Sequence, residues 1–108
     1  MLLTELLTVN RIKVPLAATD KSAALRELTQ LLADLAGVPL EPLLRAIEER
    51  ERVLSTGIGH GIAIPHAKSP LVTELVLVAG TSPAGIPFEA LDGDPVRLLF
   101  LLTGPESA

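Results

Sequence analysis

Two nearly unbroken apolar runs, at 75–79 (LVLVA) and 96–102 (VRLLFLL), constrain the fold of this 108-residue chain more than any other feature. Apolar runs of this length, without polar alternation, are typical of strands that are buried on both faces of a sheet. The segment between them, 82–95, holds five proline and glycine residues, too many for a helix of any length. Such strands need other elements to cover them, and the preceding residues must supply these elements.

The first half of the chain contains two amphipathic helical patterns. In the first pattern Asp20 is a candidate N-cap, and Gly37 with Pro39 ends the helix. Its apolar stripe consists of Leu25, Leu28, Leu32 and Leu35. The second pattern begins near Pro42, a residue favoured at the first helical position because its missing N–H would have no partner there. Two helices are therefore available to cover the strands.

Shorter elements complete the predicted fold. Leucines within 2–7 recur at helical spacing and predict a short amphipathic helix. Ile12 and Val14 predict a strand that Pro15 limits to a sheet edge, and residues 62–64 predict another strand, which Pro65 ends. We therefore predict one domain over 1–108, an α/β layered domain with a mixed β-sheet flanked by helices. Because the chain stops directly after an apolar strand, we also expect a C-terminal truncation.

The composition excludes several classes of function. With a net charge of -4 and no visible basic patch, the chain lacks the clustered Lys and Arg that neutralise nucleic-acid phosphates, and 2% aromatic residues leave few rings for base stacking. The absence of Cys excludes thiol chemistry, and His60 and His66 alone make a poor metal constellation. No signal peptide or bilayer-spanning apolar run is visible. We expect a cytoplasmic protein that binds no nucleic acid, metal or cofactor.

The central stretch, 49–68 (ERERVLSTGIGHGIAIPHAK), contains the candidate functional residues. On a helical wheel of about 100° per residue that starts at Leu43, Arg50 is the only charged side chain on the apolar stripe. A guanidinium that points toward a core is costly unless an anion meets it. Three interpretations stay open: a salt bridge with a carboxylate, a side chain that extends to solvent at the helix end, or a site for an external anion.

Gly57, Gly59 and Gly61 alternate after this helix, so that their amides could converge on an anion. Alternate glycines alone are a weak signal, because a dinucleotide fingerprint needs the opposite order of strand and helix, and no P-loop Lys follows. Neither Ser55 nor Ser69 lies in the Gly-x-Ser-x-Gly elbow of a hydrolase. Phosphoryl chemistry on an imidazole remains, because a neutral imidazole is a good nucleophile and this transfer needs mainly charge stabilisation.

Arg50, the glycine-rich loop and His66 are the parts that this chemistry requires. The segments 50–51 (RE), 55–59 (STGIG) and 61–66 (GIAIPH) resemble the signature of the enzyme IIA domain of the fructose/mannitol type, from the bacterial phosphoenolpyruvate-dependent sugar phosphotransferase system (PTS). This family includes the nitrogen-regulatory IIA proteins. The resemblance covers nearly the whole chain, including 85–102 (GIPFEALDGDPVRLLFLL), and combines a dozen ordered positions.

The resemblance implies a role for each of these residues. His66 would accept a phosphoryl group from the phosphocarrier protein HPr and pass it to a IIB partner. Arg50 would lie beside the phosphate, and Ser55 and Thr56 would frame the site and receive phosphate oxygens. The motif does not require His at position 60, so we expect no catalytic role for His60. Selection of the sugar would belong to the IIB component and to a membrane IIC component, and the chain would meet the membrane only through the latter.

The sequence departs from the family pattern near its end. The family has a second site histidine shortly after the strand that ends here near Leu102, and further helices that pack on the sheet, whereas this sequence has neither. The resemblance therefore implies a phosphate pocket with one donor fewer and a sheet face with less cover. We expect such an apolar face to be hidden by a homodimer or by aggregation.

Three functions follow from these patterns. The favoured one is a phosphoryl carrier that serves sugar uptake. The second is a regulatory phosphoprotein of the same family, in which phosphorylation of His66 changes binding to partner proteins and no sugar is moved. The third is a ligand-binding or sensory domain that has lost phosphorylation, and it predicts a collapsed pocket or a salt bridge between Arg50 and a carboxylate.

Overall fold

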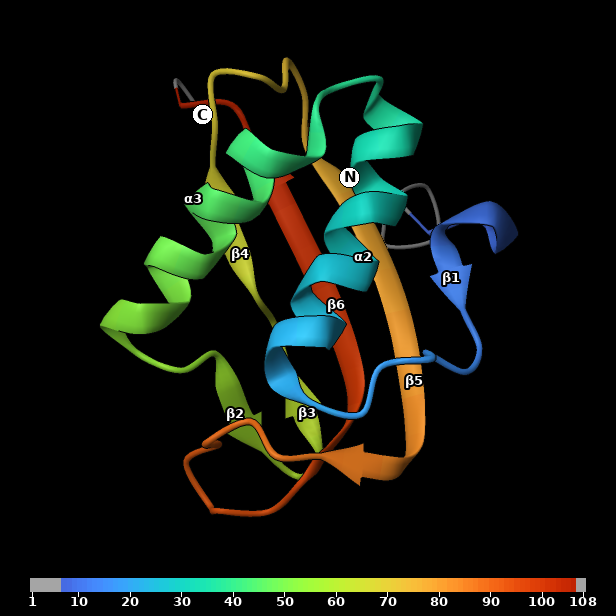
Figure 1. Cartoon of the computed structure of the whole chain (residues 1–108), viewed down its shortest axis with the longest axis vertical. Helices are drawn as coiled ribbons and strands as arrows, with labels where there is room; N and C mark the ends of the chain where they lie inside the picture. The colour runs from blue at the N-terminus through green and yellow to red at the C-terminus, as the bar shows by residue number, and fades with distance from the viewer. Residues whose placement is uncertain (1–6, 107–108) are drawn as a thin grey trace.

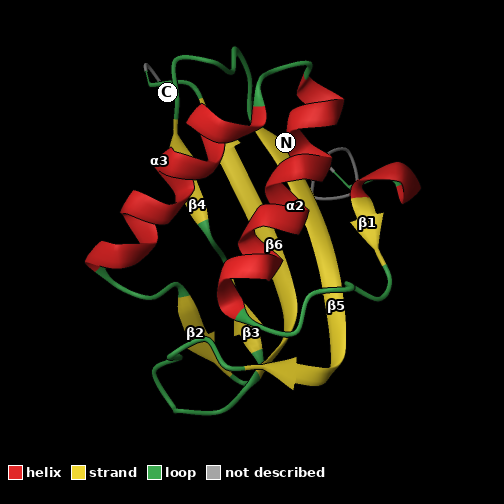
Figure 2. Cartoon of the chain, viewed as in Figure 1, coloured by secondary structure: helices red, strands yellow, loops and turns green. Residues whose placement is uncertain are grey.

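The computed structural model describes residues 7–106, which form a mixed six-stranded β-sheet with two helices on one of its faces (Figures 1 and 2). This architecture confirms the predicted α/β layered fold. The elements are the 3-10 turn η1 (Val9–Arg11), β1 (Ile12–Lys13), α2 (Lys21–Ala36), α3 (Leu40–Val53), β2 (Gly57–Gly59), β3 (Ile62–Ala63), β4 (His66–Lys68), β5 (Val76–Ile86) and β6 (Val96–Gly104). The helix predicted over 2–7 falls almost wholly outside the described residues.

The two apolar runs form the centre of the sheet, as predicted. β5 and β6 pair antiparallel, with Leu77 opposite Leu102 and Ala79 opposite Phe100. β5 is longer than its apolar run and continues to Ile86. Its register with β6 shifts between Thr81 and Ile86, and pairing resumes at Ile86, opposite Val96. The connection from β5 to β6 contains no helix, in agreement with its many prolines and glycines.

The remaining strands extend the sheet on both sides, in the order β1-β5-β6-β3-β2, with β4 also paired to β6. β1 lies at one edge and pairs parallel with β5, which confirms the predicted edge strand, but it ends at Lys13 and leaves Val14 outside. β3 and β4 both pair parallel with β6 and keep the same register, Ile62 with Leu98 and His66 with Leu102. They are two parts of one strand, interrupted where Pro65 has no N–H to donate.

α2 begins and ends where its sequence predicts. The Asp20 carboxylate accepts a hydrogen bond from the Ala23 amide at 2.8 Å, and Gly37 closes the helix in the left-handed conformation, with φ of 71°. Leu25, Leu28 and Leu32 are buried against the sheet, whereas Leu35 is 36% exposed, contrary to its predicted place in the apolar stripe. Leu35 lies in the last turn of α2.

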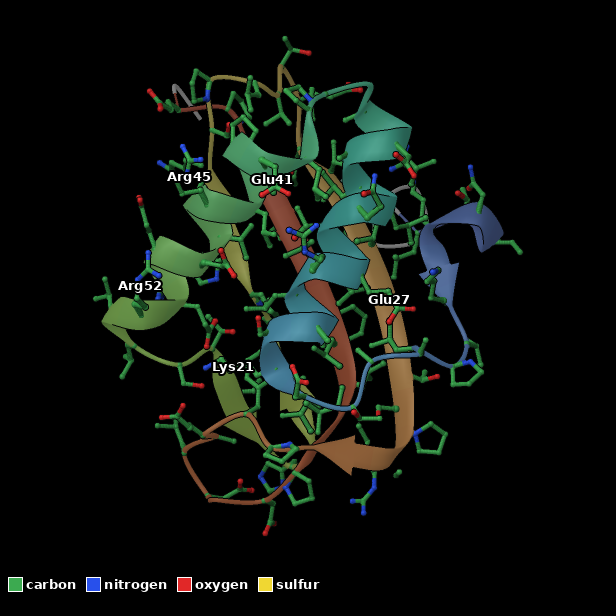
Figure 3. The ribbon with its side chains drawn as sticks, in the orientation of Figure 1. Lys21, Glu27, Glu41, Arg45 and Arg52 are labelled. Carbon is green, nitrogen blue, oxygen red and sulfur yellow. The ribbon has the colours of Figure 1, made fainter. Side chains whose placement is uncertain are left out.

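α3 begins at Leu40, two residues earlier than predicted, with Pro39 at the N-cap. Pro42 is thus its third residue, one of the first positions at which a missing N–H removes no intrahelical bond. Leu43, Leu44 and Ile47 face the core. Figure 3 shows that Arg45 lies on the outer side of this helix, away from α2.

The two faces of the sheet differ in their cover. On β6, Val96, Leu99 and Leu101 point into the core under the helices, whereas the alternating Leu98 and Phe100 are only half-buried. Both helices lie on the same side of the sheet (Figure 1), and this leaves the other face less covered. Within residues 7–106, no helix is both long and apolar enough to cross a membrane.

Candidate functional site

His66 is the first residue of β4, and its side chain is exposed. The backbone N–H missing at Pro65 separates β3 from β4 at this point, and the ring turns back on the chain. Its Nδ1 lies 2.9 Å from the carbonyl oxygen of Ile64. Because a carbonyl oxygen can only accept, Nδ1 carries the proton in this hydrogen bond. In the neutral ring the other nitrogen, Nε2, then carries the lone pair and can act as a nucleophile.

His66 and Arg50 line the same surface cavity, which has a volume of about 330 Å³. The two residues come from different elements, the end of α3 and the start of β4, and these elements are in contact. The other lining residues are Leu54, Ser55, Thr56, Gly57, Ile58, Ile64 and Leu91. All four residues named from the sequence as site residues thus lie around one cavity.

Arg50 is half-buried in the last turn of α3. Its Nη1 donates a hydrogen bond to the Leu54 carbonyl oxygen at 3.0 Å, just beyond the helix end. A cation at this position also interacts favourably with the negative end of the helix dipole. No salt bridge between Arg50 and a carboxylate is present among the described residues. The open cavity and the missing salt bridge, within residues 7–106, do not match the prediction for a domain that has lost phosphorylation.

The hydroxyl groups of Ser55 and Thr56 both form hydrogen bonds with other groups of the protein. Ser55 Oγ donates to the Phe88 carbonyl oxygen at 2.8 Å and accepts from the Gly57 amide at 3.2 Å. Thr56 Oγ1 donates to Glu51 at 2.7 Å, and the Thr56 side chain is buried. Both hydroxyl protons are therefore used within the protein, so these residues shape the cavity wall in this structure.

Glu51 is the residue that the helical wheel overlooked. It is only 6% exposed, and its carboxylate accepts from both the amide and the hydroxyl of Thr56 while Lys21 Nζ lies 2.9 Å away. Arg50 is therefore not the only charged side chain on the inner side of α3. On the same wheel Glu51 falls about 80° from Leu43, at the border of the apolar stripe, and this position was the available signal.

The alternating glycines build a β-hairpin rather than a ring of converging amides. β2 and β3 pair antiparallel, with Gly59 opposite Ile62, and the two residues between them, His60 and Gly61, both have positive φ, 58° and 77°. This is the backbone that a two-residue type I′ turn requires. Gly57 needs its missing side chain for another reason, because a Cβ there would lie 2.8 Å from the Cα of Ala90. Only Gly57 of the three glycines lines the cavity.

The hydrogen bond that fixes His60 comes from its backbone amide and not from its imidazole ring. Its amide donates to Asp92 Oδ2 at 3.0 Å, and Asp92 Oδ1 accepts from the Asp94 amide at 3.0 Å. These hydrogen bonds, the one from His60 first, lower the pKa of the Asp92 carboxyl. The His60 ring is exposed and does not line the cavity around His66. Within residues 7–106, no three His, Asp or Glu side chains gather closely enough to hold a metal ion.

A comparison with known protein families identifies the family of this chain. The family model described as "Phosphoenolpyruvate-dependent sugar phosphotransferase system, EIIA 2" matches residues 5–108. The chain belongs to this family. Its members are components of the PTS, and the resemblance seen in the sequence is thereby confirmed.

Relatives of this EIIA chain include sugar-specific and nitrogen-regulatory proteins. It is 40% identical over 110 residues to a "PTS system fructose-specific EIIABC component" of Bacillus subtilis, with 100% of the chain but 17% of that protein covered. The nitrogen regulatory protein IIA-Ntr from Neisseria meningitidis has the same fold, with a TM-score of 0.90, 30% identity, and 96% and 71% of the two chains covered. The EIIA chain thus corresponds to a small part of the first protein.

A third solved structure is a complex of enzyme IIA of the mannitol system with phosphorylated enzyme IIB from Escherichia coli. Its match to this EIIA chain has a TM-score of 0.78 and 25% identity, and covers 92% of the chain and 70% of the other. PTS IIA domains therefore interact with IIB components, as that complex shows.

Proposed function

We propose that this EIIA chain is a phosphoryl carrier of the PTS, which accepts a phosphoryl group from HPr on His66 and passes it to a IIB component for sugar uptake. The observation that carries the proposal is the hydrogen bond from His66 Nδ1 to Ile64, in a cavity that Arg50 also lines. In the neutral ring this bond leaves the lone pair on Nε2, the nitrogen that can attack phosphorus.

The transfer step follows from these groups. The Nε2 lone pair forms a bond to phosphorus, the bond from phosphorus to the donor atom breaks, and its electron pair stays with the donor. The ring gains positive charge, and the Ile64 carbonyl oxygen stabilises the proton that remains on Nδ1. Arg50 is the cation beside the cavity that can neutralise the charge on the phosphoryl oxygens, once it exchanges its bond to Leu54 for the ligand.

The rim of the cavity suits a protein partner. Leu54, Ile58 and Leu91 line the cavity and are 62%, 51% and 77% exposed. Large apolar side chains grouped in this way are typical of a surface that binds another protein. We expect HPr and the IIB component to use this rim in turn, since each must reach the same imidazole, and we expect both encounters to occur in the cytoplasm, with the membrane reached only through a IIC component.

The high structural similarity to IIA-Ntr at 30% identity supports a second candidate, a regulatory protein that is phosphorylated on the same residue and controls partner proteins. Phosphorylation would place two negative charges inside the apolar rim and change which partner binds there. The two candidates share the acceptance step and differ in the acceptor of the phosphoryl group.

The test is phosphorylation by phosphoenolpyruvate, enzyme I and HPr, followed by addition of a IIB component. We expect an acid-labile label on the wild type and on His60→Gln, and none on His66→Gln. A label that persists in His66→Gln would show that the site is wrong. Fast transfer of the label to a IIB component supports the carrier role, whereas retention of the label with every IIB component supplied supports the regulatory candidate.

A further inference from the structure

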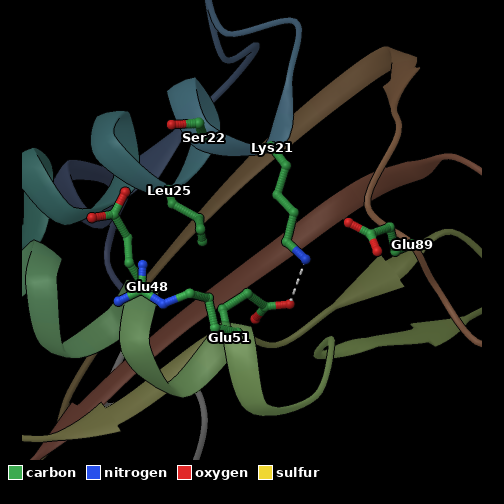
Figure 4. Close-up of a pocket in the computed structure, with 7 residues that line it drawn as sticks. Lys21, Ser22, Leu25, Glu48, Glu51 and Glu89 are labelled. Atoms are coloured by element: carbon green, nitrogen blue, oxygen red, sulfur yellow. Dashed lines mark ion pairs between the residues drawn. The ribbon is translucent and has the colours of Figure 1, made fainter.

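Behind the wall of the His66 cavity lies a second, charged cavity of about 290 Å³, between the start of α2 and the last turns of α3 (Figure 4). Figure 4 shows Lys21 extending from α2 toward Glu51 on α3, with Glu89 beyond it on the loop that precedes β6. Glu51 belongs to this cavity, and its hydrogen-bond partner Thr56 belongs to the wall of the other. The two cavities therefore share one connected polar group.

Glu51 binds the site segment with both carboxylate oxygens. Oε2 accepts from the Thr56 amide at 2.8 Å, and Oε1 accepts from the Thr56 hydroxyl at 2.7 Å. Two bonds from one residue to one carboxylate fix both the backbone and the side chain of Thr56. Thr56 is followed directly by Gly57 and Ile58, and all three line the cavity around His66.

Lys21 completes this anchor. Its Nζ lies 2.9 Å from Glu51 Oε2, 3.4 Å from the Phe88 carbonyl oxygen and 4.6 Å from the centre of the Phe88 ring. The same Phe88 carbonyl accepts the hydroxyl of Ser55. A buried carboxylate without a cation nearby is strongly unfavourable, and Lys21 supplies that cation beside Glu51.

We propose that Glu51 and Lys21 are positioning residues of the phosphoryl site. They hold Ser55 and Thr56 from behind, so that the 56–58 backbone keeps the shape of the cavity in which His66 and Arg50 meet the phosphoryl group. Neither side chain lines that cavity, so both act through Thr56 and Ser55. The expected effect on the rate of phosphoryl acceptance rests on the proposed function. The expected effect on the conformation of residues 56–58 does not, and it can be measured separately.

The kinetic test uses Glu51→Gln with Glu48→Gln as its matched control. Gln presents an N–H₂ group to one of the two Thr56 donors and loses the charge that pairs with Lys21. Glu48 is a carboxylate on the same helix and in the same cavity, but it makes no hydrogen bond to the site segment. We expect the kcat for acceptance from phospho-HPr to fall at least tenfold in Glu51→Gln, with an unchanged KM, and to stay within twofold in Glu48→Gln.

An unchanged KM separates positioning from general damage, because the substituted side chain lies outside the apolar rim that meets HPr. Thermal unfolding establishes that each variant is folded at the assay temperature. A folded Glu51→Gln variant with a kcat within twofold of the wild type would overturn the proposal. If Glu51→Gln does not fold, Thr56→Val and Thr56→Ser replace it: Val removes the hydroxyl that donates to Glu51 and should give a lower kcat than Ser, which keeps that hydroxyl. Equal rates in these two variants would overturn the proposal.

Two measurements distinguish failure of this inference from failure of the proposed function: the labelling experiment with wild type and His66→Gln, and an NMR spectrum of the backbone amides. If the wild type accepts no label, the carrier function is wrong, and positioning is then decided by the amide spectrum of the unphosphorylated protein. We expect Glu51→Gln to shift the amide signals of Thr56, Gly57 and Ile58 more than Glu48→Gln does. Unchanged signals for these three residues would overturn the anchor whatever the fate of the phosphoryl group.

Discussion

The guanidinium of Arg50 donates to the carbonyl oxygen of Leu54, four residues later, at 3.0 Å. This contact ends α3 and holds the cation at the margin of the cavity that also contains His66. It is a bond between a charged donor and a neutral acceptor, so an incoming phosphoryl dianion is a stronger partner for the same nitrogen. The contact thus holds Arg50 beside the cavity without a salt bridge to any carboxylate within residues 7–106.

Replacement of Arg50 by Lys should slow acceptance of the phosphoryl group by about tenfold to a hundredfold. Lys keeps the charge but lacks the planar set of donors that can contact two phosphoryl oxygens. The measurement is the rate of labelling from phospho-HPr, with Arg45→Lys, at an exposed position of the same helix, as the control. Equal rates in Arg50→Lys and wild type would remove Arg50 from the site.

The effect of substitutions at position 60 on stability should depend on the backbone conformation of this residue and not on the loss of its imidazole. Because its φ is 58°, we expect His60→Asn to be as stable as the wild type, and His60→Val to lose about 1–2 kcal/mol of unfolding free energy, since a β-branched residue is strained there. Urea unfolding of both variants is the measurement. The prediction fails if Asn and Val are equally stable at this position.

Glu27 should make stability depend on pH. Partial burial raises its pKa, but the amides of Ala17 and Ala18 and the ion pair with Lys13 outweigh that effect, so the pKa is lowered overall. A lowered folded pKa means that this stabilisation is present above the unfolded value of about 4.3 and is lost as the pH falls through the folded pKa. Glu27→Gln should therefore reduce stability by about 1–2 kcal/mol at pH 7.

The measurement for Glu27 is the difference in unfolding free energy between wild type and Glu27→Gln across pH 7 to 3. We expect that difference to shrink as the solution is acidified below about pH 4.3. At such pH values the Glu27 carboxylate becomes protonated, first in the unfolded and then in the folded state, and loses its advantage over Gln. Figure 3 places Glu27 on α2, on the side toward β1, where Lys13 reaches it at 3.3 Å. A difference that stays constant over this range would show that the carboxylate charge contributes nothing.

Gly57→Ala should destabilise the hairpin beside the site. A Cβ at this position would lie 2.8 Å from both the Cα and the Cβ of Ala90, and backbone on one side leaves it little room to move. We expect a loss of about 1–3 kcal/mol, in the range of an overpacked site. Gly93→Ala, which meets no atom within 4 Å but has a φ of 75°, should cost less in the same thermal unfolding measurement.

The sequence predicted the sheet and its covering helices because their signals are local. The apolar runs at 75–79 and 96–102 became β5 and β6, and Asp20 and Gly37 bound α2 as predicted, since strand burial and helix caps depend on neighbouring residues. Pattern alone did not reveal that residues 62–68 pair with β6 as a single interrupted strand. Parallel pairing depends on a partner distant in the sequence, whose position only the folded chain defines.

The sequence by itself determined which residues have the chemistry of the proposed site: one imidazole after a proline, one guanidinium at a helix end, and the serine and threonine between them. Only the tertiary structure decided their states. The Ile64 carbonyl sets the tautomer of His66, and Glu51, paired with Lys21 from another helix, takes both donors of Thr56. The physical reason is that side-chain identity is encoded residue by residue, whereas hydrogen-bond partners and burial arise from contacts between segments far apart in the chain.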